Sequence, residues 1–278
     1  MKFSLFNRTA GLRAGQHAVV TGGSSGLGLA LSRRLATRGL SVTLVARDKA
    51  RLATAAASIS DAVPSAVIDY IAVDVADSEA LAAAFDSLTQ DLDILVNSAG
   101  IIREGYFEGL STSDFHDVMD INFFGTVNTI RATLPRLKQR RGRIVNIASV
   151  AGLTGVFGYT PYCAAKHALV GFTAALRFEL EPQGVRVQLV CPGEFESPMV
   201  EDLDRTRTPE NRRHTLTIPK LRIDQLADAT VAGIDSGQRL VVPGAQTRVL
   251  VTAQRLVPSV ANAIAQQRIS AVYQGPDR

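Results

Sequence analysis

The chain has 278 residues, of which 46% are hydrophobic and 20% are charged, with a formal net charge of +4. This composition excludes a disordered or fibrous protein and suits a globular chain with one large core. No apolar run reaches the ~20 residues that a helix needs to span a bilayer, and we expect no signal peptide. The two cysteines, Cys163 and Cys191, predict neither a disulfide framework nor a metal site, which favours the cytoplasm.

Short apolar runs alternate with helical patterns along the chain. Runs typical of buried strands cover residues 17–21, 41–46, 66–74, 93–97, 143–149 and 185–191, and one long helical pattern covers 111–139. Strands that alternate with helices form a parallel sheet with helices on both faces. The sequence therefore predicts an α/β fold, a doubly wound Rossmann-type sheet, as one domain over residues 1–245. Residues 246–278 are expected to form a helical extension.

A glycine-rich segment, TGGSSGLG at 21–28, follows the first predicted strand. Glycines between a strand and a helix let the backbone turn tightly and approach a pyrophosphate at the helix N-terminus. The residues expected to contact a dinucleotide here are Gly22, Ser24, Ser25, Gly26, Leu27 and Gly28. The spacing GxxxGxG differs from the GxGxxG fingerprint. A glycine-rich turn without a ligand is the alternative.

The end of the second predicted strand indicates which dinucleotide binds. NAD-binding folds usually place an acid there to accept the ribose 2′-OH, but this sequence has Ala46 followed by Arg47. The guanidinium of Arg47 offers a planar fork of donors to a 2′-phosphate, and Ser24 adds a hydroxyl. Asp48 is expected to cap the helix that begins at Lys49. The predicted cofactor is therefore NADP(H).

Candidate proton-transfer residues lie between 149 and 166. Tyr162 and Lys166 are four residues apart in a helical pattern, so they share a helix face. An ammonium group near a phenol favours the phenolate and lowers the phenol pKa from about 10. Ser149, at the carboxyl end of a predicted strand, is placed to hydrogen-bond a substrate oxygen. The set predicts proton transfer to a carbonyl/alcohol pair, although YxxxK alone is a common pair of surface neighbours.

The glycine-rich loop, Ser149 and the YCAAK segment together resemble the short-chain dehydrogenase/reductase family, over residues 15 to 200. The resemblance implies that Tyr162 protonates a carbonyl polarised by Ser149, with hydride from the nicotinamide. It also implies that Lys166 lowers the Tyr162 pKa and contacts the nicotinamide ribose. Further implied site residues are Asp74 and Val75 at the adenine, Asn97, Ala99 and Gly100 in an NSAG turn, Asn122 in a proton relay with Lys166, and Pro192, Gly193 and Ser197 beside the carboxamide. For Asn122, a helix Asn bonded to backbone carbonyls is the alternative.

The last segment departs from many members of that family, which end soon after a strand near residue 242. One helical face carries Val249, Ala253, Leu256, Val257, Val260 and Ile264, with Arg248, Arg255 and Arg268 beside it. Pro258 is expected to kink or divide the helix. The helix either packs on the body or on a subunit of a homo-oligomer (dimer or tetramer), or lies on a membrane surface with its arginines at the headgroups.

The segments 152–185 and 194–213 and the tail look most like the 3-ketosphinganine reductase branch of the family. That likeness implies a hydrophobic, lipid-like ketone as substrate. An apolar groove is expected from Val156, Phe157, Tyr159, Phe195, Met199, Val200, Leu203, Leu216, Ile218 and Leu221 together with the tail. The alternatives are a small ketone, a steroid or a 3-oxoacyl substrate, a cofactor-binding regulator, and a membrane-recruited protein. The basic residues lack interleaved aromatics, so nucleic acid is not expected as a partner.

Overall fold

The computed structural model describes residues 11–215 and 219–274. In this part of the chain a seven-stranded parallel sheet has the order β3-β2-β1-β4-β5-β6-β7. The strands are β1 (His17–Thr21), β2 (Ser41–Ala46), β3 (Ile68–Ala72), β4 (Ile94–Asn97), β5 (Arg143–Ile147), β6 (Arg186–Val190) and β7 (Leu240–Val241). The predicted doubly wound sheet is confirmed. Its order reverses between β1 and β4, and open α/β sheets bind ligands at such a point.

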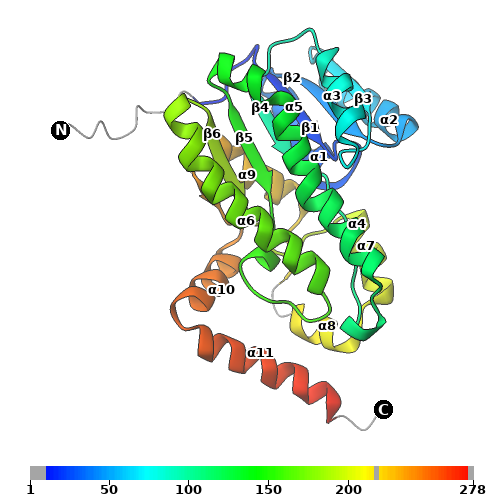
Figure 1. Cartoon of the computed structure of the whole chain (residues 1–278), viewed down its shortest axis with the longest axis vertical. Coiled ribbons are helices and arrows are strands. Elements are labelled where there is room, and N and C mark those ends of the chain that lie inside the picture. Colours follow the sequence, from blue (N-terminus) through cyan, green and yellow to red (C-terminus); the bar gives the residue numbers. More distant parts are fainter. Residues whose placement is uncertain (1–10, 216–218, 275–278) are drawn as a thin grey trace, which may run out of the picture.

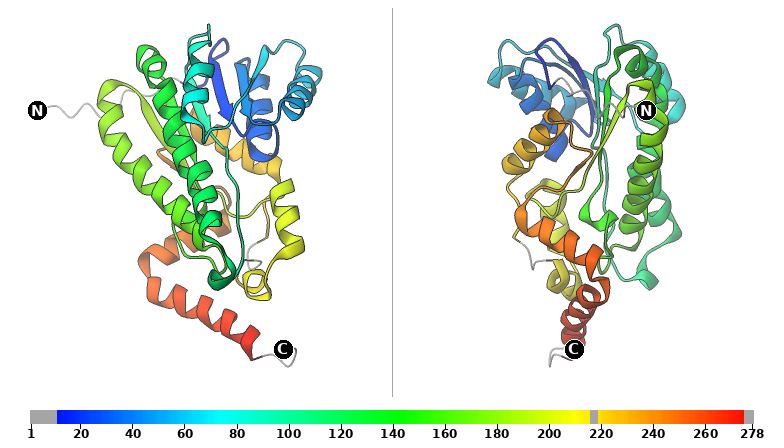
Figure 2. Two further views of the ribbon diagram at one scale, coloured as in Figure 1. Left: turned by 45° about the vertical axis from the view of Figure 1, so that its right-hand side comes forward. Right: turned by 90° about the vertical axis from the view of Figure 1, so that its left-hand side faces the viewer.

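Helices cover both faces of the sheet (Figure 1). One layer holds α1 (Gly26–Thr37), α2 (Lys49–Ala62) and α9 (Ile223–Asp235), and the opposite layer holds α3 (Ser78–Asp86), α5 (Gly125–Arg140) and α6 (Thr160–Leu180). The edge-on view in Figure 2 separates the two layers. Successive residues of β1 point to opposite faces of the sheet. Ala18 and Val20 belong to the hydrophobic cluster on one face, and Val19 belongs to the cluster on the other. Burial on both sides explains why the central strands are continuously apolar.

The helix predicted over 111–139 is interrupted. It consists of α4 (Thr112–Met119), a π-helical turn η2 (Asp120–Phe124) and α5. A π-helical turn inserts extra backbone into a helix and is frequent at functional sites. Here it carries the predicted relay residue Asn122, whose side chain is fully buried.

Most of the remaining elements gather at the carboxyl end of the sheet. They are the short helical turns η1 (Phe107–Gly109) and η3 (Val150–Gly152), and the helices α7 (Pro198–Thr206), α8 (Pro209–Thr215), α10 (Ala245–Leu256) and α11 (Pro258–Tyr273). The turn η4 (Glu181–Gln183) lies at the opposite end, between α6 and the start of β6. The tail divides at Pro258, as predicted. Helix α10 follows β7, and α11 runs under α8 (Figure 1). None of the helices in the described ranges has the length and apolar character needed to cross a bilayer.

Candidate active site

The loop between β1 and α1 is packed so closely that glycine is required at two of its positions. A Cβ on Gly22, whose φ is +67°, would lie 2.9 Å from the backbone of Ser98 and Ala99. A Cβ on Gly28 would lie 2.3 Å from the carbonyl oxygen of Gly22. The hydroxyl of Thr21 accepts hydrogen bonds from the Ser98 and Ala99 amides, both at 3.1 Å. The loop is therefore held against the turn after β4, and this leaves a bare backbone surface at the N-terminus of α1.

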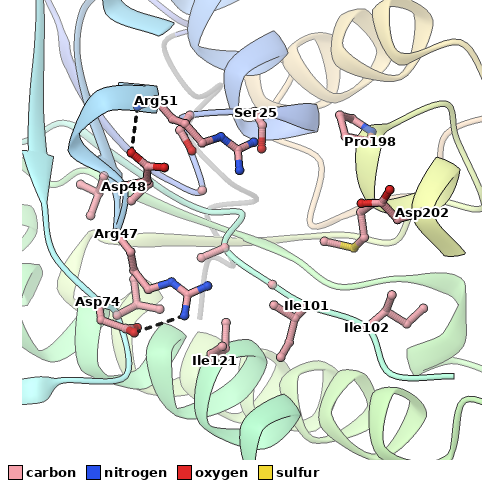
Figure 3. A pocket seen from close by; sticks show the side chains of 18 of the residues that line it. Ser25, Arg47, Asp48, Arg51, Asp74, Ile101, Ile102, Ile121, Pro198 and Asp202 are labelled. Carbon is pink, nitrogen blue, oxygen red and sulfur yellow. Dashed lines mark hydrogen bonds and ion pairs between the residues drawn. The ribbon is translucent and has the colours of Figure 1, made fainter. Parts of the chain in front are cut away.

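A cavity of about 660 Å³ opens beside this loop, at the carboxyl ends of β2 and β3. The predicted residues that line it are Gly22, Ser24, Ser25, Arg47, Asp74, Val75, Ala99 and Gly100. Arg47 forms an exposed ion pair with Asp74 at 3.6 Å (Figure 3). The carboxylate of Asp48 accepts a hydrogen bond from the Arg51 amide at 3.0 Å, which confirms it as the cap of α2.

Arg51 was not foreseen from the sequence. Its guanidinium reaches into the same cavity toward Ser25 (Figure 3). The available signal was the predicted cap: Arg51 is three residues after Asp48 and so falls in the first turn of α2, next to the end of the second strand. Two guanidinium groups therefore line the part of the cavity where the second strand ends.

A second cavity, of about 510 Å³, contains the predicted proton-transfer residues Ser149, Tyr162 and Lys166. Tyr162 and Ser149 share a hydrogen bond. The ammonium of Lys166 donates to the carbonyl of Ile147 at 3.0 Å and lies 5.5 Å from the centre of the Tyr162 ring. The structure thus brings the three residues together at the carboxyl end of β5 and on α6.

The electrostatics of this group differ from the expectation. Burial raises the pKa of Tyr162 to about 12, although the hydrogen bond from Ser149 opposes the rise. Burial also lowers the pKa of Lys166 to about 8. The net lowering of the Tyr162 pKa that we expected from Lys166 is not found, because desolvation of the phenol outweighs the stabilisation of the phenolate by an ammonium that faces the ring and a backbone carbonyl. Tyr162 is consequently a neutral phenol at pH 7.

The side chains of three other predicted site residues form hydrogen bonds within the protein. The amide group of Asn122 bonds to both the N–H and the C=O of Ile101, at 2.8 and 2.9 Å, so its side chain fits the alternative of a backbone-satisfied Asn. The amide of Asn97 donates to Asn146 at 2.8 Å inside the core. The hydroxyl of Ser197 accepts from the Val200 amide at 3.3 Å and caps α7. The other predicted residues that line the second cavity are Gly26, Leu27, Gly28, Pro192 and Gly193.

The second cavity is largely apolar on the side away from the glycine loop. Of the residues predicted to form a groove, Val156, Tyr159, Phe195, Met199, Val200 and Leu203 line it. Phe157 instead packs edge-to-face on Tyr106, and Leu221 forms a backbone bridge with Phe195. Leu216 and Ile218 lie outside the described residues.

The tail completes this wall. Leu250 and Ala253 from α10 and Ile264, Ala265 and Arg268 from α11 line the same cavity as Tyr162. The opposite side of the tail is exposed and still apolar: Val249, Leu256, Val257 and Val260 are 49–73% exposed. The tail therefore packs on the body with one side only. In the part of the chain that the structure describes, no cluster of His, Cys, Asp or Glu is arranged to hold a metal ion.

A buried arginine, unforeseen from the sequence, holds the helices above the cavity. The side chain of Arg207 has no exposed surface. Its partners are Glu194 (2.7 Å), Asp204 (2.8 Å), Thr215 (2.7 Å), Asn211 (2.9 Å) and the hydroxyl of Tyr159 (3.4 Å). The ring of Tyr159 in turn packs edge-to-face on Tyr162, with 5.8 Å between centroids. Arg207 thus links α7, α8 and the loop after β6 to Tyr159, the residue that packs on Tyr162.

We expect Arg207→Met to lower the free energy of unfolding by about 3–5 kcal/mol, because it removes a fully buried cation and leaves the largely buried carboxylate of Glu194 without its ion-pair partner. Arg205→Met is the matched control, since Arg205 is two residues away and pairs only at the surface with Asp202. Urea denaturation of both variants measures the difference. Equal stability of the two variants would show that the buried cluster does not hold the fold.

Comparison with known proteins agrees with this geometry. Residues 16–208 match the sequence model of a family described as short chain dehydrogenase. A 3-ketodihydrosphingosine reductase from Bos taurus is 36% identical over 227 residues, which cover 78% of this chain and 68% of that protein. The granaticin polyketide synthase putative ketoacyl reductase 1 of Streptomyces violaceoruber is 39% identical over 199 residues, which cover 69% of this chain and 72% of that protein.

Two solved structures are similar over most of their length. A variant of actinorhodin polyketide ketoreductase with NADPH has a TM-score of 0.75 and 30% identity, and the match covers 82% of this chain and 95% of that one. A short chain dehydrogenase from Burkholderia cenocepacia in complex with NADP has a TM-score of 0.77 and 28% identity, with coverage of 91% and 98%.

Proposed function

Because this chain belongs to the short-chain dehydrogenase family, and is therefore an oxidoreductase that acts on carbonyl compounds with a nicotinamide dinucleotide, we propose that it reduces a hydrophobic, lipid-like ketone with NADPH. One observation carries the proposal. The hydrogen-bonded pair Ser149–Tyr162 opens into a cavity whose far wall is apolar and is completed by the tail helices.

The residues around the glycine-rich loop fit a dinucleotide. A Cβ on Gly26, the first residue of α1, would meet no atom within 4 Å, so the backbone at the N-terminus of α1 is open where a pyrophosphate is favourably placed. Arg47 and Arg51 line the cavity at the end of β2, so a 2′-phosphate would meet two guanidinium groups. This pair supports NADP(H) rather than NAD(H). Asp74, Val75, Ala99 and Gly100 line the same cavity.

When bound, the cofactor supplies the hydride, and the residues of this chain supply the proton. Tyr162 is protonated at pH 7, so its hydroxyl donates a proton to the carbonyl oxygen as negative charge develops there. Ser149 orients the phenol through their hydrogen bond and polarises the carbonyl. The ammonium of Lys166, against the Tyr162 ring, stabilises the phenolate that remains after the transfer.

The apolar wall and the relatives' names support a long-chain ketone as substrate. The matched proteins include a 3-ketodihydrosphingosine reductase and ketoacyl reductases, so a 3-oxoacyl compound is the second candidate. The decisive experiment is NADPH oxidation with a panel of long-chain 3-ketones, 3-oxoacyl thioesters and short ketones. Turnover of short ketones alone would refute the lipid-like substrate.

We expect Arg47→Asp to shift cofactor preference toward NADH by about tenfold or more in kcat/KM, because it replaces a donor to the 2′-phosphate with a repelling carboxylate. The matched control is Lys49→Asp, which makes the same change of charge two residues later, outside the cavity lining. Steady-state kinetics with NADPH and NADH measure the ratio. An unchanged ratio in Arg47→Asp would remove this residue from the phosphate site.

The exposed apolar residues support two further proposals about assembly. Phe178 on α6 is 83% exposed and Phe124 beside α5 is 47% exposed, which suits a homo-oligomer formed over these helices. The exposed side of the tail, with Arg255 next to Leu256, suits contact with a membrane surface from which an apolar substrate would enter. Light scattering and liposome flotation of the full chain test the two separately.

A further inference from the structure

A hydroxyl without a partner lines the catalytic cavity at the start of the tail. Thr247 is the third residue of α10 and is only 3% exposed, and it lines the same cavity as Ser149 and Tyr162. No described residue forms a hydrogen bond with its hydroxyl. The hydroxyl of Thr230 also lacks a partner but is sealed in the core, whereas that of Thr247 retains accessible surface. The polar atom is therefore within reach of a ligand in the cavity.

The position of Thr247 in its helix explains the missing partner. Buried threonines in the helices of this chain donate to the carbonyl four residues earlier, as Thr129 does to Gly125 at 2.7 Å. For Thr247 the corresponding residue is Pro243, which lies before the helix begins, and this bond is not formed. A buried hydroxyl without a partner costs stability, and a ligand that hydrogen-bonds to it removes this cost.

The hydroxyl packs over the turn that adjoins Ser149. A Cβ on Gly193 would lie 3.1 Å from Oγ1 of Thr247, so the missing side chain at Gly193 makes room for the hydroxyl. The preceding residue, Pro192, accepts a hydrogen bond from the amide of Val150 at 2.9 Å, and Val150 directly follows Ser149. Thr247 thus stands at the end of the cavity where the reacting atoms meet.

The chemistry expected at this end indicates which group the hydroxyl meets. Hydride transfer requires the nicotinamide ring within roughly 3–3.5 Å of the carbonyl carbon that Ser149 and Tyr162 hold. The ring carries a carboxamide on the carbon next to the one that gives up the hydride. A carboxamide offers an N–H donor and a C=O acceptor, and a hydroxyl pairs with either. Ser197, the residue expected beside the carboxamide, already accepts from the Val200 amide, whereas the hydrogen-bonding capacity of Thr247 is unused.

We propose that the hydroxyl of Thr247 binds the carboxamide of the nicotinamide ring, so that the first turn of the tail is part of the cofactor site. The inference rests on the proposed use of a nicotinamide cofactor. It adds a binding residue beyond residues 15–200, where the sequence resembles the family. Because α10 leads directly into α11, the same contact links the bound cofactor to the two helices that complete the apolar wall.

The test separates the nicotinamide end of the cofactor from its adenosine end. Thr247→Val removes the hydroxyl with little change of shape, and we expect it to raise the dissociation constant of NADPH about fivefold, the effect of one hydrogen bond between neutral groups. Adenosine 2′,5′-bisphosphate carries the adenine and the 2′-phosphate without the nicotinamide, so its dissociation constant should stay unchanged. Isothermal titration calorimetry measures both ligands without any turnover.

Two further variants serve as controls. Thr252→Val makes the same change at an exposed position of α10, where the hydroxyl donates to the Arg248 carbonyl at 2.8 Å, and it should leave both constants unchanged. Thr247→Ser keeps the hydroxyl and should bind NADPH more tightly than Thr247→Val. If Thr247→Val does not fold, Thr247→Ala replaces it in both comparisons.

Three results overturn the proposal. They are an unchanged NADPH constant in Thr247→Val, equal weakening of NADPH and the bisphosphate, as a purely structural role would give, and a Ser variant that binds NADPH no better than the Val variant.

The proposed function fails by different results. A wild-type enzyme that binds NADH instead of NADPH refutes the NADPH assignment, and the same comparison between NADH and AMP then tests Thr247. A wild-type enzyme that binds NADPH but reduces no ketone refutes the proposed substrate and leaves the binding test intact. An enzyme that binds neither dinucleotide overturns both proposals.

Discussion

Tyr162→Phe is expected to lower kcat by ~10²-fold or more, because it removes the hydroxyl that donates the proton in general acid catalysis. The dissociation constant of NADPH should change little, since the lost interaction is made with the reacting carbonyl. The ring, its contact with Tyr159 and the position of Lys166 remain. Stopped-flow reduction and fluorescence titration with NADPH measure the two quantities separately.

Tyr159→Phe is the control for this experiment. It removes the same atom from the neighbouring ring, whose hydroxyl meets Arg207 instead of Ser149. We expect a loss of less than about tenfold there, below the range of a missing general acid. A Tyr162→Phe enzyme that retained a tenth of its kcat, or equal losses in both variants, would mean that another group donates the proton.

The second large effect is expected from the apolar wall. Each buried methylene contributes about 0.8 kcal/mol, so kcat/KM should rise about threefold or more per two carbons of substrate chain after the costs of ordering. Ala265→Asp places a carboxylate in the wall contributed by α11 and should flatten this dependence. The slope of log kcat/KM against chain length is the measurement.

Ala263→Asp provides a matched control on the same helix. Ala263 is exposed and does not line the cavity, so the same substitution there should preserve the slope. Reduction of short ketones should survive in both variants. If wild type is indifferent to chain length, the apolar wall does not bind the substrate; if both variants keep the full slope, α11 has no part in it.

The sequence predicted the fold well where strands are buried on both faces. The bounds expected for β1 and β2 coincide with the structure, because an apolar run ends where burial ends. The edge strand β3 was predicted two residues too long at each end, over 66–74. Its residues are only half-buried and alternate with exposed ones such as Asp69, so composition marks its ends poorly.

The site residues also fall into two groups: those that spacing along the chain predicts, and those whose role depends on burial in the folded structure. Ser149, Tyr162 and Lys166 follow from spacing along the chain, and the structure places them together. Arg207 was not foreseen, because it lies in a charged run with Arg205 that is typical of a solvated helix. Two residues along a helix differ by about 200°, so one arginine is exposed and the other buried. The error in the Tyr162 pKa had a similar origin, since helical spacing gives proximity but not desolvation.

The cavity draws its lining from Gly22 at one end of the sequence and Arg268 at the other. During synthesis the ribosome releases the chain from the N-terminus at about 5–20 residues per second, so the strands through β6 emerge before α11. A nascent chain therefore presents an apolar cleft that its own last helix has yet to close. We expect that stage to be the one at which chaperones protect it. A premature stop codon after α10 would make this exposure permanent, yielding a protein whose sheet folds and whose open cleft promotes aggregation.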